Sequence, residues 1–139
     1  SEIHALVGYE SLLIIKNLLE KRNAQVSLYK ETLNNEYFSF QEIQEDSKST
    51  FKDFAIIPTY IETRENRDNL INYLNASGIN VKVYFDPPIH THDFYKNHNF
   101  NNLNNTEEIK NKIICLPLFY SLEDKDILYI SKKMNEYFD

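Results

Sequence analysis

Residues 63–90 read TRENRDNLINYLNASGINVKVYFDPPIH and contain a helix signal followed directly by a strand signal. Thr63 is placed to cap the helix, whose apolar residues recur at helical spacing. Gly78 is the expected stop of this helix, because glycine readily adopts the left-handed conformation that ends many helices. Apolar and polar residues then alternate over residues 79–85, which predicts a half-buried strand. That strand should end at Pro87, because proline cannot donate to a ladder.

Further strand and helix signals lie on both sides of this segment. Residues 37–40 alternate as an edge strand does, and residues 54–57 and 113–116 are short apolar runs typical of buried strands. Short helices are expected to begin at Thr106 and Ser121, which are residue types that cap helices. The resulting order alternates helices with short strands.

Residues 1–34 predict a long N-terminal helix that begins after Ser1. The fold class is therefore α+β: a small, mainly antiparallel sheet of three to four strands, packed with helices and preceded by that long helix. We expect residues 1–139 to form a single domain, with the long helix at 1–34 and a small α+β domain at 36–139.

The predicted first helix has a wider apolar face than one small domain needs. Two neighbouring sets of residues form this face: Ile3, Leu6, Val7, Leu13, Ile14 and Leu18, and beside them Tyr9, Leu12, Ile15 and Leu19. We expect something outside the helix to cover it.

Composition excludes several classes of protein. The 139 residues contain only two glycines, Gly8 and Gly78, whereas a P-loop, a dinucleotide fingerprint and a glycine-rich nucleophile turn each need several. The formal net charge of −6 argues against nucleic acid as a partner. No apolar run is long enough to span a membrane, so no membrane partner is expected. Cys115 is the single cysteine, which fits a reducing cytoplasm.

The loop after residue 88 offers one candidate metal site. His90, His92, Asp93 and His98 are residue types that bind zinc or iron, and the alternative is a set of solvated loop histidines. Acidic pairs such as Glu107 with Glu108 are explained by helix starts, where carboxylates complement the dipole. Cys115 lies in an apolar strand pattern, where a thiol behaves as a small hydrophobic group.

The turn after the predicted strand is a second candidate site. Two prolines fix the chain between Tyr84 and His90, so this turn can present both side chains as the rim of a ligand site. The alternative is a proline-terminated strand whose aromatic residues only pack. The residues alone leave both interpretations of this turn open.

A resemblance to a known family emerges at this point. Its motif consists of Gly78-Ile79, then Tyr84-Phe85-x-Pro87-Pro88-x-His90, then Tyr95. This order resembles the small domain of the DegT/DnrJ/StrS aminotransferases. Three more segments match in register: residues 1–8 with Arg22 and Tyr29, residues 66–74, and residues 115–118 with Leu122. The resemblance therefore covers nearly the whole chain.

This resemblance implies a function. Members of the family use pyridoxal phosphate (PLP) to aminate keto-sugars carried on nucleotides, including in polysaccharide or lipopolysaccharide biosynthesis. It implies the small-domain fold of fold-type I PLP aminotransferases. It also implies that Tyr84 and His90 face the sugar nucleotide, supported by Phe85 and Tyr95. Many members have His-Tyr where this chain has Tyr84-Phe85, and the Tyr-Phe version suggests a dTDP-linked sugar.

The resemblance also implies what this chain lacks. The family's large domain, with its Schiff-base lysine, has no counterpart here, so no residue is assigned a catalytic or cofactor-binding role. We expect a C-terminal domain or fragment of a cytoplasmic enzyme, inactive alone and without bound PLP. Its first helix would face the missing large domain or a homodimer partner. The alternatives are a stand-alone α+β ligand-binding or regulatory module, and a metal-binding protein that uses His90, His92 and His98.

Overall fold

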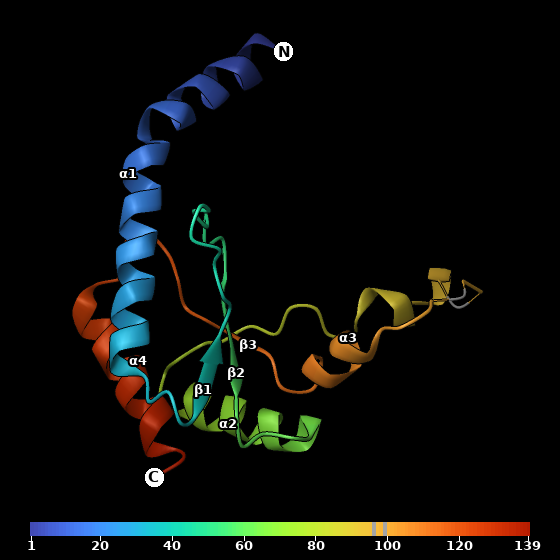
Figure 1. Ribbon diagram of the computed structural model, residues 1–139. Coiled ribbons are helices and arrows are strands. Elements are labelled where there is room, and N and C mark those ends of the chain that lie inside the picture. The colour runs from blue at the N-terminus through green and yellow to red at the C-terminus, as the bar shows by residue number, and fades with distance from the viewer. Residues whose placement is uncertain (96, 99) are drawn as a thin grey trace.

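The computed structural model describes residues 1–95, 97–98 and 100–139, and its elements confirm the predicted α+β class (Figure 1). In chain order they are α1 (Glu2–Thr32), β1 (Phe38–Phe40), β2 (Phe54–Pro58), α2 (Arg64–Ala76), the 3-10 helices η1 (Ile89–Thr91) and η2 (Asp93–Tyr95), α3 (Asn104–Ile109), β3 (Ile114–Leu116) and α4 (Asp124–Glu136). The long first helix is present as predicted. None of the described helices is long and apolar enough to cross a membrane.

The sheet has three strands in the order β1-β2-β3, and both pairs are antiparallel. Ser39 pairs with Ile57 and Ala55 pairs with Cys115, so β2 is central and β1 lies at an edge, as its short alternating pattern predicts. Along β2, Phe54 and Ile56 are buried while the residues between them are half-buried. One face of the sheet therefore packs into the core.

The fourth predicted strand, at residues 79–85, is reduced to a single bridge. Lys82 N–H donates to the Cys115 carbonyl at 3.1 Å, and Cys115 N–H donates to the Lys82 carbonyl at 2.7 Å. Toward the start of the segment, the next hydrogen-bonded pair would join Asn80 to Pro117, which has no N–H, so the ladder cannot extend in that direction. Ile79 is buried as the alternation predicts, but Phe85 is 69% exposed because the chain has turned away from the sheet.

The caps of α2 are those that the sequence predicts. The Thr63 hydroxyl oxygen accepts a hydrogen bond from the Asn66 N–H at 3.2 Å. Beyond the other end of α2, Gly78 has φ +77°, in the left-handed region that glycine adopts at little cost.

The predicted caps of the two later helices are wrong. α3 begins at Asn104, so Thr106 lies inside the helix rather than before it. α4 is capped by Glu123 instead of Ser121, and the side chains of Glu123 and Asp126 form a reciprocal capping box. At α4 an acidic residue meets the need for a hydrogen-bond acceptor, and Leu103 before α3 makes no side-chain cap, so residue type alone does not locate these starts.

The core joins the C-terminal half of α1 to the sheet, α2 and α4. Its helical members are Val26 and Tyr29 from α1, Leu70 and Leu74 from α2, and Ile127, Ile130 and Met134 from α4. Polar contacts also hold α1 in place: the Gln25 amide donates to the carbonyls of Phe119 and Leu122 at 3.1 and 2.9 Å.

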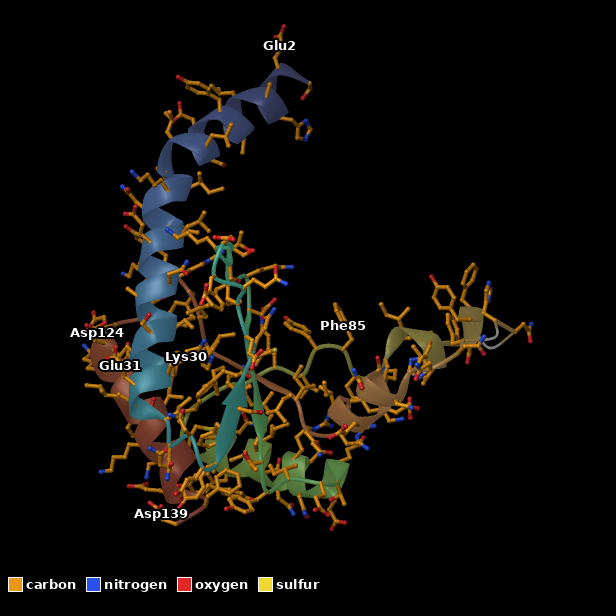
Figure 2. All side chains as sticks on the ribbon, in the orientation of Figure 1. Glu2, Lys30, Glu31, Phe85, Asp124 and Asp139 are labelled. Atoms are coloured by element: carbon orange, nitrogen blue, oxygen red, sulfur yellow. The ribbon has the colours of Figure 1, made fainter. Side chains whose placement is uncertain are left out.

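The N-terminal half of α1 leaves this core and projects away from the rest of the chain (Figures 1 and 2). Its apolar residues are exposed, from 74% for Ile3 to 45% for Ile15. Over residues 3–15, the apolar face predicted from the sequence therefore has no partner among the described residues, whereas Leu18 and Leu19 at its end are half-buried.

Candidate ligand-binding site

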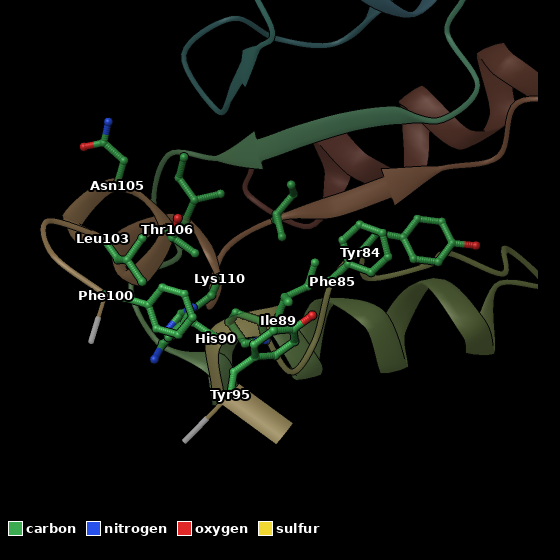
Figure 3. Close-up of a pocket in the computed structure, with 13 residues that line it drawn as sticks. Tyr84, Phe85, Ile89, His90, Tyr95, Phe100, Leu103, Asn105, Thr106 and Lys110 are labelled. Carbon is green, nitrogen blue, oxygen red and sulfur yellow. The ribbon is translucent and has the colours of Figure 1, made fainter. Parts of the chain in front are cut away.

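A cleft of about 590 Å³ lies where the chain projects from the sheet between residues 84 and 113 (Figure 3). Two walls enclose it. The turn wall consists of Tyr84, Phe85, Pro88, Ile89 and His90, and the helix wall consists of Leu103, Asn105, Thr106, Ile109, Lys110 and Ile113. Tyr95 and Phe100 complete the lining. This volume is in the range of ordinary small-molecule sites.

The four residues expected to contact a ligand all line this one cleft: Tyr84, Phe85, His90 and Tyr95. The rings of Tyr84 and Phe85 lie 5.8 Å apart and are partly exposed. The rings of His90 and Tyr95 each lie 6.2 Å from that of Phe100. The cleft thus presents aromatic faces along its length, with Tyr84 at one end and Tyr95 and Phe100 toward the other (Figure 3).

Three polar side chains form a chain at the cleft. His90 Nε2 lies 2.7 Å from Glu107 Oε1, and Lys110 Nζ lies 2.5 Å from Glu107 Oε2. The hydrogen bonds from Lys110 and His90 hold the pKa of the Glu107 carboxyl below its ordinary range. Glu107 therefore stays ionised and orients the side chains of His90 and Lys110 at a cleft whose lining is mainly apolar and aromatic.

Sequence reasoning missed two members of this polar chain. The sequence explains Glu107 only as an acidic residue at a helix start, and it does not indicate Lys110 as a site residue. Their spacing of three residues places both on one face of a helix, which is the local signal for such a pair. The contact with His90 joins residues that are 17 apart in sequence, and no local pattern predicts it.

The histidines proposed as metal ligands do not come together. His90 contacts Glu107, His92 Nε2 lies 3.2 Å from the Pro87 carbonyl oxygen, and the His98 ring stacks on Phe100. In the described part of the chain, no three histidine, cysteine or acidic side chains gather closely enough to hold a metal ion.

Cys115 is 4% exposed in the central part of the fold. Burial raises the pKa of its thiol, so the reactive thiolate is disfavoured. The structure therefore agrees with the prediction that the Cys115 thiol is a small hydrophobic group in a strand.

Comparison with known proteins identifies relatives over almost the whole chain. The model of the DegT/DnrJ/EryC1/StrS aminotransferase family matches residues 1–135. The chain is 25% identical over 138 residues to GDP-perosamine synthase of Escherichia coli O157:H7, an alignment that covers 99% of this chain and 36% of that protein. It is 27% identical to dTDP-4-amino-4,6-dideoxy-D-glucose transaminase of Shigella dysenteriae, with 98% and 37% covered.

The fold has close counterparts among solved structures. One is a DegT DnrJ EryC1 StrS aminotransferase from Brucella abortus, which superposes with a TM-score of 0.81 at 25% identity. The superposition covers 93% of this chain and 33% of that one. The chain thus spans about a third of the length of the relatives it matches.

Proposed function

Because this chain belongs to the DegT/DnrJ/EryC1/StrS aminotransferase family, we propose that it is the C-terminal part of a PLP-dependent enzyme that aminates nucleotide-linked keto-sugars. Two curated relatives are named as a perosamine synthase and an aminosugar transaminase, and each aligns with this chain over about a third of its own length. In this proposal the rest of the enzyme supplies the catalytic machinery. The chain supplies walls of the substrate site and acts in the cytoplasm, in polysaccharide or lipopolysaccharide biosynthesis.

The observation that carries the proposal is the cleft itself, which gathers Tyr84, Phe85, His90 and Tyr95. Aromatic faces suit the planar base of a nucleotide and the apolar face of a sugar ring. His90 and Lys110 are donors that suit phosphate oxygens or sugar hydroxyls. We therefore assign the cleft to the sugar nucleotide.

The cofactor is expected to be held elsewhere in the enzyme. PLP supplies an electron sink for amino transfer once it is linked to a lysine. Among the described residues, Lys110 is the lysine that lines the cleft, and its ammonium group is paired with Glu107. A lysine that forms the linkage to PLP must lose its proton, and this pairing keeps the proton on Lys110. Gly8 and Gly78 are the only glycines, so no glycine-rich loop is available to cradle the phosphate. The described residues that line the cleft therefore do not fit the group, and we assign none of them to it.

The exposed half of α1 is expected to pack on the remainder of the enzyme or on a second copy. A stand-alone binding module would be expected to cover its own first helix, yet Leu6, Leu13 and Ile14 are each about 60% exposed. Apolar residues repeated along one face at this exposure are typical of an interface. This observation favours the aminotransferase over the module.

The test begins with the reading frame immediately upstream of Ser1, which should encode a large domain with a Schiff-base lysine. That longer protein should convert a nucleotide-linked keto-sugar to an amino sugar with PLP and glutamate, as read by mass spectrometry. The 139-residue chain incubated alone with PLP should give no stoichiometric adduct after borohydride reduction. Such an adduct at one lysine of this chain would overturn the proposal.

A pair of matched variants tests the assignment of the cleft. His90→Ala removes a lining residue and should raise KM for the sugar nucleotide, by about tenfold if one charge-assisted hydrogen bond is lost. His92→Ala removes a neighbouring histidine outside the lining and should leave KM unchanged. Equal effects of both variants would contradict the assignment.

A further inference from the structure

A buried arginine on α2 connects the two walls of the cleft without lining it. Arg67 is 2% exposed, which is rare for an arginine. Its guanidinium group reaches out of the helix to two segments that are distant in sequence from it and from each other.

The first connection is to the turn wall. Arg67 Nη2 donates to Asp86 Oδ2 at 2.8 Å. Asp86 follows Phe85 directly in the chain, so this bond fixes the backbone from which the turn wall projects. Arg64 also reaches Asp86 Oδ2, at 3.0 Å, but its side chain is 62% exposed.

The second connection is to the helix wall. Arg67 Nη1 donates to the backbone carbonyl of Lys110 at 3.0 Å. Lys110 lines the cleft, and its side chain pairs with Glu107. Two further bonds, from Nε and Nη2 to Asp68 Oδ1 at 3.0 and 2.8 Å, fix the plane of the guanidinium group.

We propose that Arg67 is a positioning residue that sets the spacing between the two walls and so fits the cleft to its ligand; this rests on the proposed function. The guanidinium group is a rigid, planar fork, and its Nη1 and Nη2 reach one wall each. Lysine carries the same charge on a single nitrogen and cannot hold both walls in the same geometry.

Stability alone does not account for this arrangement. Removing an arginine and an aspartate from water carries a desolvation cost that can equal the gain from pairing them, and an apolar pair can be as stable. What the arginine adds is a fixed backbone geometry between two segments that also meet through the contact of His90 with Glu107. The variant that tests this is therefore Arg67→Lys, which keeps the charge and removes the fork.

The first experiment measures hydrogen exchange in the full-length protein that contains this chain. The reporters are two amides whose hydrogen bonds involve a wall residue: His92 N–H donates to the carbonyl of Ile89 in the turn wall, and Lys110 N–H donates to the carbonyl of Thr106 in the helix wall. In Arg67→Lys both should exchange at least about tenfold faster, while amides of β2 keep their protection. Arg64→Lys alters the exposed partner of the same aspartate and should leave both amides unchanged.

The second experiment separates positioning from stability. Arg67→Lys should raise KM for the sugar nucleotide by about tenfold with little change in kcat, because the wall spacing affects binding. Leu70→Ala removes a fully buried side chain from the same helix and should lower Tm without changing KM below its unfolding transition.

The outcomes distinguish this inference from the proposed function. Unchanged exchange at both walls in Arg67→Lys, faster exchange at one wall only, or a loss spread over β2 would each overturn the positioning role. If the full-length protein turns over no sugar nucleotide, the proposed function fails. The exchange result still decides whether Arg67 joins the walls.

Discussion

One substitution, made at two isoleucines, tests whether the exposed half of α1 is an interface. Ile14 in α1 is 59% exposed, and Ile127 in α4 is fully buried. Both lie inside long helices, so replacement by alanine brings the same small gain in helix propensity at each position. The difference between the two variants therefore reports only the packing of the side chain.

The expected magnitudes follow from burial. In the 139-residue chain, Ile127→Ala should lower the free energy of unfolding by about 2 to 5 kcal/mol, because it leaves a cavity in the core. Ile14→Ala should change the same quantity by no more than about 0.5 kcal/mol, as surface substitutions do. The assay is urea unfolding followed by circular dichroism, with equal m-values confirming that the folded states are comparable.

The same pair is then measured in the full-length protein. If the exposed face packs on the remainder of the enzyme or on a second copy, Ile14→Ala should now cost about 2 kcal/mol or more, close to Ile127→Ala. Two results would refute the reasoning. A large cost of Ile14→Ala in a monomeric 139-residue chain would mean that the face is already covered, and no cost in either protein would mean that it is not an interface.

Three further predictions concern single groups. Burial raises the pKa of the Tyr29 hydroxyl above its ordinary value of about 10, so the free energy of unfolding should fall as pH rises above about 10. Tyr29→Phe removes this ionisable group, together with its hydrogen bond to the Pro117 carbonyl, so the fall with pH should be shallower in this variant when the free energy of unfolding is measured at equilibrium. Gly78→Ala should cost about 1 to 2 kcal/mol in the same measurement, because φ is +77° there. Among the described residues, apart from its two chain neighbours, no atom lies within 4 Å of the added methyl group, so the backbone conformation sets the cost. Lys110→Met should raise the pKa of Glu107 toward its ordinary value, as read by carboxyl chemical shifts in a pH titration, and an unchanged pKa would contradict the observed pairing.

The strand signal at residues 79–85 shows where sequence reasoning about the fold stops. The alternation is present, and Ile79 and Val81 are buried as it predicts. Whether the segment forms a ladder depends on its neighbour β3, which ends at Leu116, directly before Pro117. Local pattern reports which face is buried, whereas pairing is a property of two segments, and only the structure joins them.

In the candidate site, too, one part could be predicted from the sequence and another part could not. The turn wall was predictable because prolines, aromatic residues and His90 lie together within seven residues of sequence. The helix wall was not, because Glu107 and Lys110 belong to the site only through contacts with distant residues. Arg67 was visible as part of a family motif, but its burial and its two connections required coordinates.

The first helix gives the strongest link between sequence and function. Val26 and Tyr29 of its C-terminal half lie in the core, whereas the apolar residues of its N-terminal half, from Ile3 to Ile15, are exposed. Burying apolar surface stabilises a helix only where something covers it, and helix propensity alone leaves exposed segments marginal. An apolar face that continues over several turns without a partner among the described residues is the observation behind our proposal that this helix is shared. In that proposal, the C-terminal half of α1 packs on the core of this chain, and its N-terminal half packs on the remainder of the enzyme or on a second copy.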